Sequence, residues 1–258
     1  MPDSGKTAKD PYEVPALRRA EQILQALAAS ASPVKAADLL ARTGLSRSTL
    51  YLLLDSLESK GWIERRQEGY IVGVRLFELG SAYVRHENVR EVFRAEAARF
   101  VAIHNEVVQM AVLDGAEVVY IAREDAPQPI RLVSDLGMRL PAHCSALGKA
   151  LLASLDDADV SAALPRTLPA LTPKSITRLP DLLAELDTVR RQGIALDREE
   201  ASAGLSCYAA YIGRTSVGRR LAVSTSVPVS RMTRARERKI VVEVVNMARR
   251  IAQRIGGH

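Results

Sequence analysis

The chain has 258 residues, of which 47% are hydrophobic and 26% are charged, and its formal net charge is +6. This length favours two domains of unequal size, and this composition is typical of a globular protein with a hydrophobic core. No apolar run reaches the roughly 18 residues that a transmembrane helix needs, so no membrane-spanning helix is expected.

Two observations predict a cytoplasmic location. The first ten residues are polar and lack the apolar centre of a signal peptide. The two cysteines, Cys144 and Cys207, lie far apart in the sequence, which fits a reducing compartment better than a disulfide framework.

The distribution of charge does not locate a nucleic-acid site. Residues 214–258 hold 11 basic and 2 acidic residues, whereas residues 1–75 hold 11 and 9. An Arg-rich segment of this kind is typical of the solvated face of a helix. The case for DNA binding therefore depends on motifs rather than on net charge.

The chain begins with a polar segment, residues 1–13, which is predicted to be disordered. Pro15 then starts a helical pattern that ends at a Ser- and Pro-containing cluster, residues 30–33. A second, short helix is predicted over residues 35–43, ended by Gly44 in the left-handed conformation. Its inward-facing residues are expected to be Ala37, Leu40 and Ala41.

The third helix is the candidate recognition helix. Ser46 lies where an N-cap belongs, because its hydroxyl can accept a hydrogen bond from a free amide of the first turn. Apolar residues at i, i+3, i+4 and i+7 form its packing stripe: Leu50, Leu53, Leu54 and Leu57. Two short strands follow, over residues 62–65 and 70–72, and the three helices with this hairpin predict a winged helix.

The remainder predicts a connector and an α+β domain. Residues 74–99 have a helical pattern and are interpreted as a connector between domains. Strands at 107–113 and 117–121 flank Asp114-Gly115, a favoured tight-turn pair. Further strands are predicted at 130–134, 205–212 and 221–227, and further helices at 145–155, 179–192 and 234–255. This order of elements predicts a mostly antiparallel sheet.

The helix-turn-helix pattern points to DNA. The second helix of such a pair lies in the major groove with its N-terminal residues against base edges. Arginine can form paired hydrogen bonds with guanine, and hydroxyl side chains or wing cations can contact bases or phosphates. The predicted DNA-binding residues are Ser46, Arg47, Ser48, Thr49, Tyr51, Arg65 and Arg66. The alternative is a capped amphipathic helix in an ordinary helical bundle.

Four ordered motifs occur along the chain, at residues 37–53, at 69–80, at 140–153, and at 191–200 continued by 204–207. Together they resemble the isocitrate lyase regulator (IclR) family of bacterial transcription factors. The resemblance implies an α+β chain with a winged helix-turn-helix over residues 14–75, a linker helix over 76–95 and a GAF-like effector-binding domain over 96–258. It also implies a dimer or dimer of dimers, a pseudo-palindromic DNA operator and a small, usually acidic effector.

The resemblance places the effector on one face of the sheet of the second domain. The implied effector-binding residues are Leu132, Leu140, Ala146, Leu147, Asp197, Leu205, Cys207, Ser224 and Ser226. Ser224 and Ser226 alternate along a strand and so share a face, where hydroxyls can bind a carboxylate; pairing across strands is the alternative. Asp197 suits an anion only if it accepts a hydrogen bond from the ligand or is protonated. Because some relatives have a Gly-Ala pair where this chain has Ala146-Leu147, we expect an aromatic or larger acid rather than glyoxylate or pyruvate.

Three other functions fit the sequence less well. An enzyme is disfavoured because adjacent residues such as His143, Cys144 and Ser145 point to different faces of a strand, and no Gly-x-Ser-x-Gly elbow or phosphate loop occurs. His143, Cys144 and Cys207 lack the spacing of a metal site, so neither a metal nor a cofactor is expected. A purely architectural DNA-binding protein would not need the large second domain.

Overall fold

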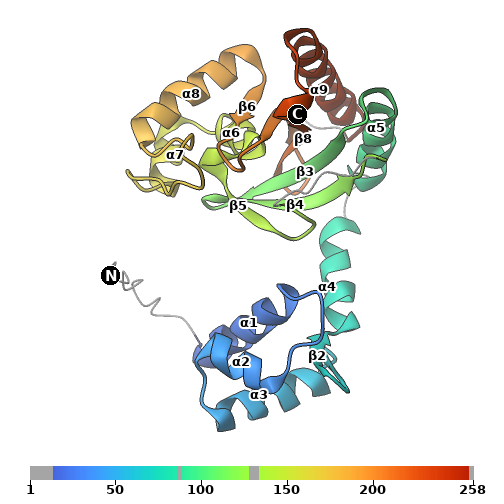
Figure 1. Ribbon diagram of the computed structural model, residues 1–258, viewed down its shortest axis with the longest axis vertical. Helices are drawn as coiled ribbons and strands as arrows, with labels where there is room; N and C mark the ends of the chain where they lie inside the picture. Colours follow the sequence, from blue (N-terminus) through green and yellow to red (C-terminus); the bar gives the residue numbers. More distant parts are fainter. Residues whose placement is uncertain (1–13, 86–88, 128–133, 256–258) are drawn as a thin grey trace. The chain divides into compact units, whose positions relative to one another are not determined.

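A computed structural model describes residues 14–85, 89–127 and 134–255 (Figure 1). This part of the chain divides into two units, the first ending with helix α4 and the second beginning with helix α5. The segment predicted to be disordered, residues 1–13, lies outside the described residues. Each unit has its own hydrophobic core and is described by itself.

The first unit is a helix-turn-helix with a two-stranded wing. Its elements are α1 (Pro15–Ala28), α2 (Ala36–Thr43), α3 (Arg47–Ser59), β1 (Ile63–Arg66), β2 (Gly69–Val72) and α4 (Val74–Arg85). β1 and β2 are antiparallel, with Arg66 opposite Gly69. The predicted stripe on α3 is confirmed, since Leu50, Leu54 and Leu57 are buried and Leu53 packs against the same core.

The inward face predicted for α2 is wrong by one residue. Leu39 is fully buried, whereas Ala37 and Ala41 are exposed and Leu40 is half-buried. The helix is rotated so that Ala36, Leu39 and Leu40 face the core. Burying a leucine removes far more apolar surface from water than burying an alanine, so the larger side chain sets the orientation of the helix.

The turn between α2 and α3 depends on two residues. Gly44 has φ 64°, and its amide donates to the Leu40 carbonyl at 3.0 Å, which ends α2 in the predicted left-handed conformation. Ser46 is the N-cap of α3, since its Oγ accepts a hydrogen bond from the Thr49 amide at 3.2 Å. The sequence therefore stops one helix and starts the next within three residues.

The second unit contains a mixed set of helices and strands. They are α5 (Val89–His104), β3 (Val107–Asp114), β4 (Glu117–Glu124), β5 (Arg139–Pro141), η1 (Ala142–Cys144), α6 (Ala146–Leu152), α7 (Asp157–Ala163), α8 (Leu179–Gln192), β6 (Ala195–Arg198), β7 (Leu205–Arg214), β8 (Arg220–Pro228), η2 (Val229–Arg231) and α9 (Arg234–Ile255). Among the described residues the sheet has the order β5-β4-β3-β8-β7-β6, and each neighbouring pair is antiparallel.

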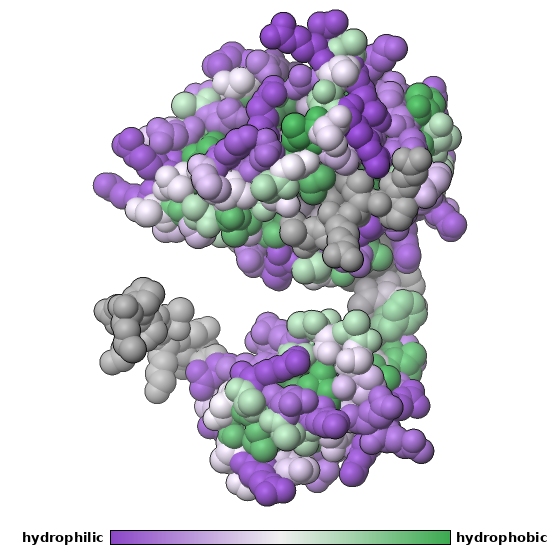
Figure 2. Space-filling model, viewed as in Figure 1, coloured by the Kyte–Doolittle hydropathy of each residue, from purple (hydrophilic) through white to green (hydrophobic). Residues whose placement is uncertain are grey.

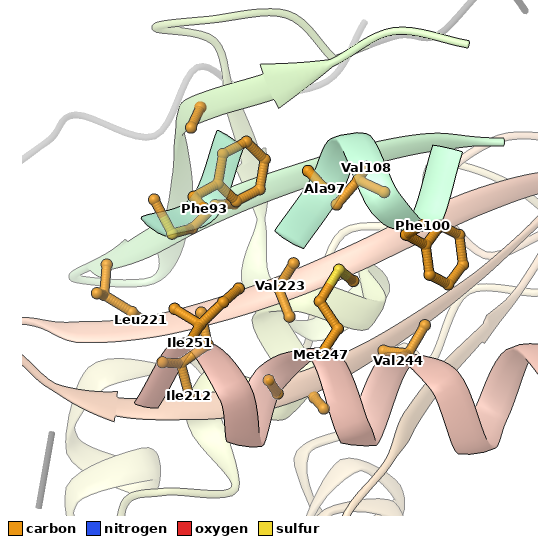
Figure 3. Close-up of a cluster of buried hydrophobic side chains, with 14 of the residues drawn as sticks. Phe93, Ala97, Phe100, Val108, Ile212, Leu221, Val223, Val244, Met247 and Ile251 are labelled. Carbon is orange, nitrogen blue, oxygen red and sulfur yellow. The ribbon is translucent and has the colours of Figure 1, made fainter. Parts of the chain in front are cut away.

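Helices cover both faces of this sheet. On one face α5 and α9 pack against alternate residues of β3, β7 and β8, where Phe93, Phe100 and Met247 fill the core (Figure 3). On the other face α6 and α8 cover a second cluster that includes Ala111, Ala209 and many leucines of these helices. Figure 1 shows α6, α7 and α8 on one side of the sheet and α5 and α9 on the other.

Several sequence predictions differ from the observed elements. The helix predicted over 74–99 is described as two helices, α4 and α5, and residues 86–88 between them lie outside the described residues. The N-terminal half of α5 contributes Val92 and Phe93 to the core of the second unit. The strand predicted at 130–134 lies outside the described residues except for Ser134, which is not in a strand. The short elements β5, β6 and α7 were not predicted.

Candidate DNA-binding and effector sites

The first turns of α3 present polar side chains to solvent. Arg47 and Ser48 are exposed, Tyr51 is 40% exposed and Thr49 is half-buried. The guanidinium carbon of Arg47 lies 5.9 Å from the centre of the Tyr51 ring, within the range of a cation–π contact. These residues lie on the side of α3 away from the buried leucines. The same helix can therefore pack through one face and contact DNA through the other.

Ser46 is more closely tied to the helix than its neighbours. Besides accepting from the Thr49 amide, its Oγ lies 2.8 Å from Thr49 Oγ1 and 3.2 Å from Ser48 Oγ. The hydroxyl thus stabilises the start of α3, and a contact with DNA would use the exposed side of the same group.

The two arginines of the wing have different surroundings. Arg65 and Arg66 are both exposed on β1. Arg65 lies over the Tyr70 ring at 6.0 Å from its centre, whereas Arg66 forms an ion pair with Glu64. Glu64 also accepts a hydrogen bond from the Val74 amide at 3.3 Å. Since the Glu64 carboxylate offsets the charge of Arg66, Arg65 is the more available cation for a phosphate.

Sequence reasoning missed Leu52 on α3. This side chain is 72% exposed although it belongs to a helix rich in buried leucines. It lies four residues after Ser48, on the next turn of the same face. The signal in the sequence was a leucine that falls outside the i, i+3, i+4, i+7 stripe.

In the second unit, most of the predicted effector-binding residues line a single cavity. The cavity lies on the α6 face of the sheet and has a volume of about 30 Å³. The predicted residues that line it are Leu140, Ala146, Leu147, Asp197, Leu205, Cys207, Ser224 and Ser226. Leu132 lies outside the described residues.

A row of side chains crosses three strands at this cavity. Ser226 of β8 is paired with Cys207 of β7, and Cys207 is paired with Asp197 of β6. The sulfur of Cys207 lies 3.2 Å from Ser226 Oγ. Ser224 shares the face of Ser226 and is paired with Gln109 of β3. Both serines therefore have cross-strand partners and line the cavity as well.

The cavity also has residues that sequence reasoning missed. They are Gln109, Tyr120, Ser134, Ser145, Ala201 and Ser202. Gln109 and Ser134 exchange hydrogen bonds, with Gln109 Nε2 3.1 Å from Ser134 Oγ. Gln109 is a polar residue within an apolar strand, which was a usable signal, because a buried amide needs partners. The loop residues gave no such signal.

Asp197 is a buried carboxylic acid that accepts hydrogen bonds from the backbone. It is 2% exposed, and its Oδ1 accepts hydrogen bonds from the amides of Glu200 at 2.7 Å and Ala201 at 3.4 Å. Burial raises the pKa of Asp197 to about 6, and the nearby Glu200 carboxylate acts in the same direction, while the backbone amides and Lys149 oppose the shift. Asp197 therefore changes its charge close to neutral pH.

A buried lysine lies behind this wall. Lys149 of α6 is 1% exposed, and its Nζ lies 2.7 Å from Glu200 Oε1 and 3.3 Å from Glu185 Oε1. Its charge is thus matched by two carboxylates. Among the described residues that line the cavity none is basic.

The residues considered for an enzyme or metal site have other roles. His143 is buried with its Nε2 2.8 Å from the Pro169 carbonyl, and burial raises the pKa of the Cys144 thiol to about 12, so it is a poor nucleophile at neutral pH. No group of three His, Cys, Asp or Glu within the described ranges could hold a metal. In the same ranges no helix is both long and apolar enough to cross a membrane.

Comparison with known proteins agrees with both halves of the structure. The family model for the IclR helix-turn-helix domain matches residues 16–67, and that for the bacterial transcriptional regulator IclR C-terminal domain matches residues 81–253. The HTH-type transcriptional repressor AllR of Salmonella typhimurium is 33% identical over 224 residues, which are 86% of this chain and 82% of the relative. AllR of Escherichia coli K12 is 31% identical over 224 residues, 86% of this chain and 83% of the relative.

Two solved structures extend the comparison. IclR of Thermotoga maritima has a TM-score of 0.74 and 28% identity, over 93% of this chain and 98% of that one. An IclR homolog from Microbacterium hydrocarbonoxydans, solved in complex with 4-hydroxybenzoate, has a TM-score of 0.81 and 25% identity, over 93% and 99% of the two chains.

The helix-turn-helix, the separate domain and the two matching family models define a DNA-binding transcription regulator with an effector-binding domain. The chain belongs to the IclR family of transcription regulators.

Proposed function

We propose that this protein is a cytoplasmic transcription repressor of a catabolic operon, whose affinity for a pseudo-palindromic operator is controlled by an organic or aromatic acid. The observation that supports it most is the cavity on the α6 face, where eight side chains implied by the family resemblance line one space. The relatives are named repressors, which favours repression over activation.

The operator contacts are assigned to α3 and the wing. Arg47, Ser48, Thr49 and Tyr51 meet base edges or adjacent phosphates, Ser46 orders the first turn, and the wing arginines meet the backbone. The exposure of Arg47 and of Arg65 supports these roles.

The protein acts as a homodimer or a dimer of dimers, because a pseudo-palindrome presents two half-sites. Exposed apolar side chains in the first unit support an interface between copies. Phe77 and Val74 of α4 are 73% and 61% exposed, and Leu17 of α1 is 65% exposed. Figure 2 shows hydrophobic residues at the surface along α4. Such side chains gain apolar burial when two copies associate.

The effector site is proposed to open when it binds its ligand. A volume of about 30 Å³ has room for about two water molecules, so a benzoate-sized acid needs displacement of wall residues such as Leu147. Leu147 belongs to α6, which packs on the sheet. Displacement of Leu147 is therefore proposed to move helix α6 as well as the side chain. A coupling free energy of about 1–3 kcal/mol is enough to change operator affinity between about 5-fold and 150-fold.

The experiment is a titration of operator DNA with the full-length protein, followed by fluorescence anisotropy, with and without 4-hydroxybenzoate, pyruvate and glyoxylate at pH 5.5 and 7.5. Loss of operator affinity with an acid supports the proposal, and we expect the aromatic acid to act at lower concentration. Operator affinity that none of these or other carboxylic acids changes would contradict it. Phe77→Ser, measured by analytical ultracentrifugation, tests the interface and should shift the protein towards monomer.

A further inference from the structure

The cavity of the second unit restricts the ionic form of the ligand it can hold. Asp197 is the carboxylic acid on its wall, and the other polar groups that line it are neutral donors and acceptors. These groups belong to Gln109, Tyr120, Ser134, Ser145, Ser202, Cys207, Ser224 and Ser226. A ligand carboxylate would therefore enter a buried space that contains a second carboxylate and no lining cation among the described residues. Two such charges in a desolvated site repel each other strongly.

The elements around Asp197 do not provide a free positive charge. Tyr120 of β4, Cys144 of η1 and Cys207 of β7 are its titratable neighbours without charge, and burial raises the pKa of each above its ordinary value. The charged neighbours are Lys149 of α6, Glu185 of α8 and Glu200 after β6, with His143 of η1 beyond them. The Lys149 ammonium is already bound by two carboxylates, so this cluster is negative while Asp197 is ionised.

We propose that the cavity binds a carboxylic acid together with one proton, which is shared between the ligand carboxyl and Asp197. This inference rests on the proposed function of the cavity as the effector site. The proton comes from solvent, and no covalent bond other than the O–H bond changes. The ligand anion, ionised Asp197 and one proton form a complex with a short O–H···O⁻ hydrogen bond in place of the repulsion.

The charge state of the empty cavity fixes the direction of the pH effect. With a pKa of about 6, Asp197 is mostly protonated at pH 5 and ionised at pH 8. Below pH 6 Asp197 is mostly protonated already, so binding of the acid takes up only a fraction of a proton from solvent. Above pH 6 each bound acid requires a proton from solvent, and its affinity falls by up to tenfold per pH unit.

The test is isothermal titration calorimetry of the full-length protein with 4-hydroxybenzoate, glyoxylate and pyruvate. Each titration is run at pH 5.5 and pH 8.0 in two buffers of different ionisation enthalpy, which gives the number of protons taken up. We expect close to one proton at pH 8.0, a small fraction of one at pH 5.5, and a fall in affinity of roughly 80-fold between pH 5.5 and pH 8.0. The uncharged isostere 4-hydroxybenzamide should bind without proton uptake.

Two variants isolate the carboxylate. Asp197→Asn removes the titrating group, so it should bind the acid with no proton uptake and with the same affinity at both pH values. Glu199→Gln is the matched control, because Glu199 is a half-buried neighbour paired with the exposed Lys174 and does not line the cavity, and it should keep the proton uptake of the parent protein. Acid binding without proton uptake at pH 8.0 would overturn this inference and leave the proposed function intact. No binding of any acid at pH 5.5 would overturn both.

A second inference comes independently from the first unit. Leu52 is the most exposed leucine of α3 and lies on the face that carries Ser48 and Tyr51. Leucine has no hydrogen-bonding group, and the apolar group that the major groove offers is the 5-methyl of thymine. We infer that Leu52 contacts a thymine methyl in each half-site, which rests on the assignment of this face to DNA.

This contact can be tested by removing the methyl from the DNA and the side chain from the protein. An operator is selected from a random duplex library, and each thymine is replaced in turn by deoxyuridine, which lacks only the methyl group. For the parent protein one replacement in each half-site should weaken binding about fourfold, the effect of one buried methyl-sized group. Leu52→Ala should bind the thymine and deoxyuridine operators equally well. Leu171→Ala, which changes an exposed leucine of the second unit, should still bind the thymine operator more tightly. If Leu52→Ala distinguishes thymine from deoxyuridine at every position as well as the parent protein does, the inference is wrong.

Discussion

The ammonium of Lys149 lies 2.7 Å from the carboxylate of Glu200, and both side chains are almost fully removed from solvent. Removing one member of a buried ion pair leaves the other charged and unsolvated, which costs about 3–5 kcal/mol. Lys149→Met should therefore lower the free energy of unfolding of the second unit by about this amount, measured by urea denaturation and circular dichroism. Lys174→Met breaks the pair between the exposed Lys174 and the half-buried Glu199 and should cost less, about 1 kcal/mol or below. Equal effects of the two substitutions would contradict the role assigned to burial.

The pKa of Asp197 predicts a pH dependence of stability. Because the folded-state pKa of about 6 exceeds the unfolded value of 3.8, the folded chain holds a proton that the unfolded chain releases. The stabilisation from this proton is fully present below pH 4 and is lost as the pH rises to about 6. Asp197→Asn has no titrating group here and does not lose this stabilisation. The difference between the melting temperatures of the variant and the parent should therefore shift in favour of the variant between pH 4 and pH 8. A relative melting temperature that is the same at both pH values would contradict the assigned pKa.

The arginines of α3 and the wing should affect DNA binding in different ways. Arg47→Ala removes a candidate contact to guanine and should weaken specific binding by about 1–3 kcal/mol with relaxed sequence preference. Arg65→Ala removes a candidate phosphate contact, so it should weaken binding to all sequences and reduce the salt dependence by about one counterion. Anisotropy titrations on specific and unrelated duplexes at several salt concentrations separate the two. An Arg47→Ala variant with full sequence preference would remove Arg47 from the base contacts.

Gly148 lies where α6 approaches the backbone most closely. A Cβ at this residue would overlap the main chain of Ala142. Gly148→Ala should therefore destabilise the second unit by about 1–3 kcal/mol through overpacking. Gly80→Ala in α4 is the control, because nothing lies within 4 Å of its added Cβ, and it should stabilise the first unit by up to about 1 kcal/mol. Fluorescence of Trp62, the single tryptophan, follows the first unit, and circular dichroism follows both.

The fold was predictable where one local pattern sufficed. The leucines of α3, the cap at Ser46 and the stop at Gly44 each act within a few residues, and all three are observed as predicted. The face of α2 was predicted wrongly because an eight-residue helix with several alanines has no single clear apolar stripe, and the choice of Leu39 is made by the rest of the core.

The candidate effector site was predictable through family resemblance rather than through local pattern. No sequence spacing relates Ser226, Cys207 and Asp197, because their alignment depends on the pairing of three strands. The buried Lys149 was missed for the same reason, since its partner Glu200 is 51 residues away in the chain. Short segments such as β6 have too few residues for a periodic signal and are held by their neighbours.

The central strands of the sheet determine the order in which the two units can form during synthesis. β3 pairs with β8, and the Thr225 hydroxyl donates to the Val107 carbonyl across 118 residues of sequence. Helix α9, which covers this pair, is the last described element. The second unit can close its core only after α9 has left the ribosome. The first unit, in contrast, has all of its core residues by Tyr70. A chain whose synthesis stops early would therefore possess a folded DNA-binding unit without a folded effector-binding domain.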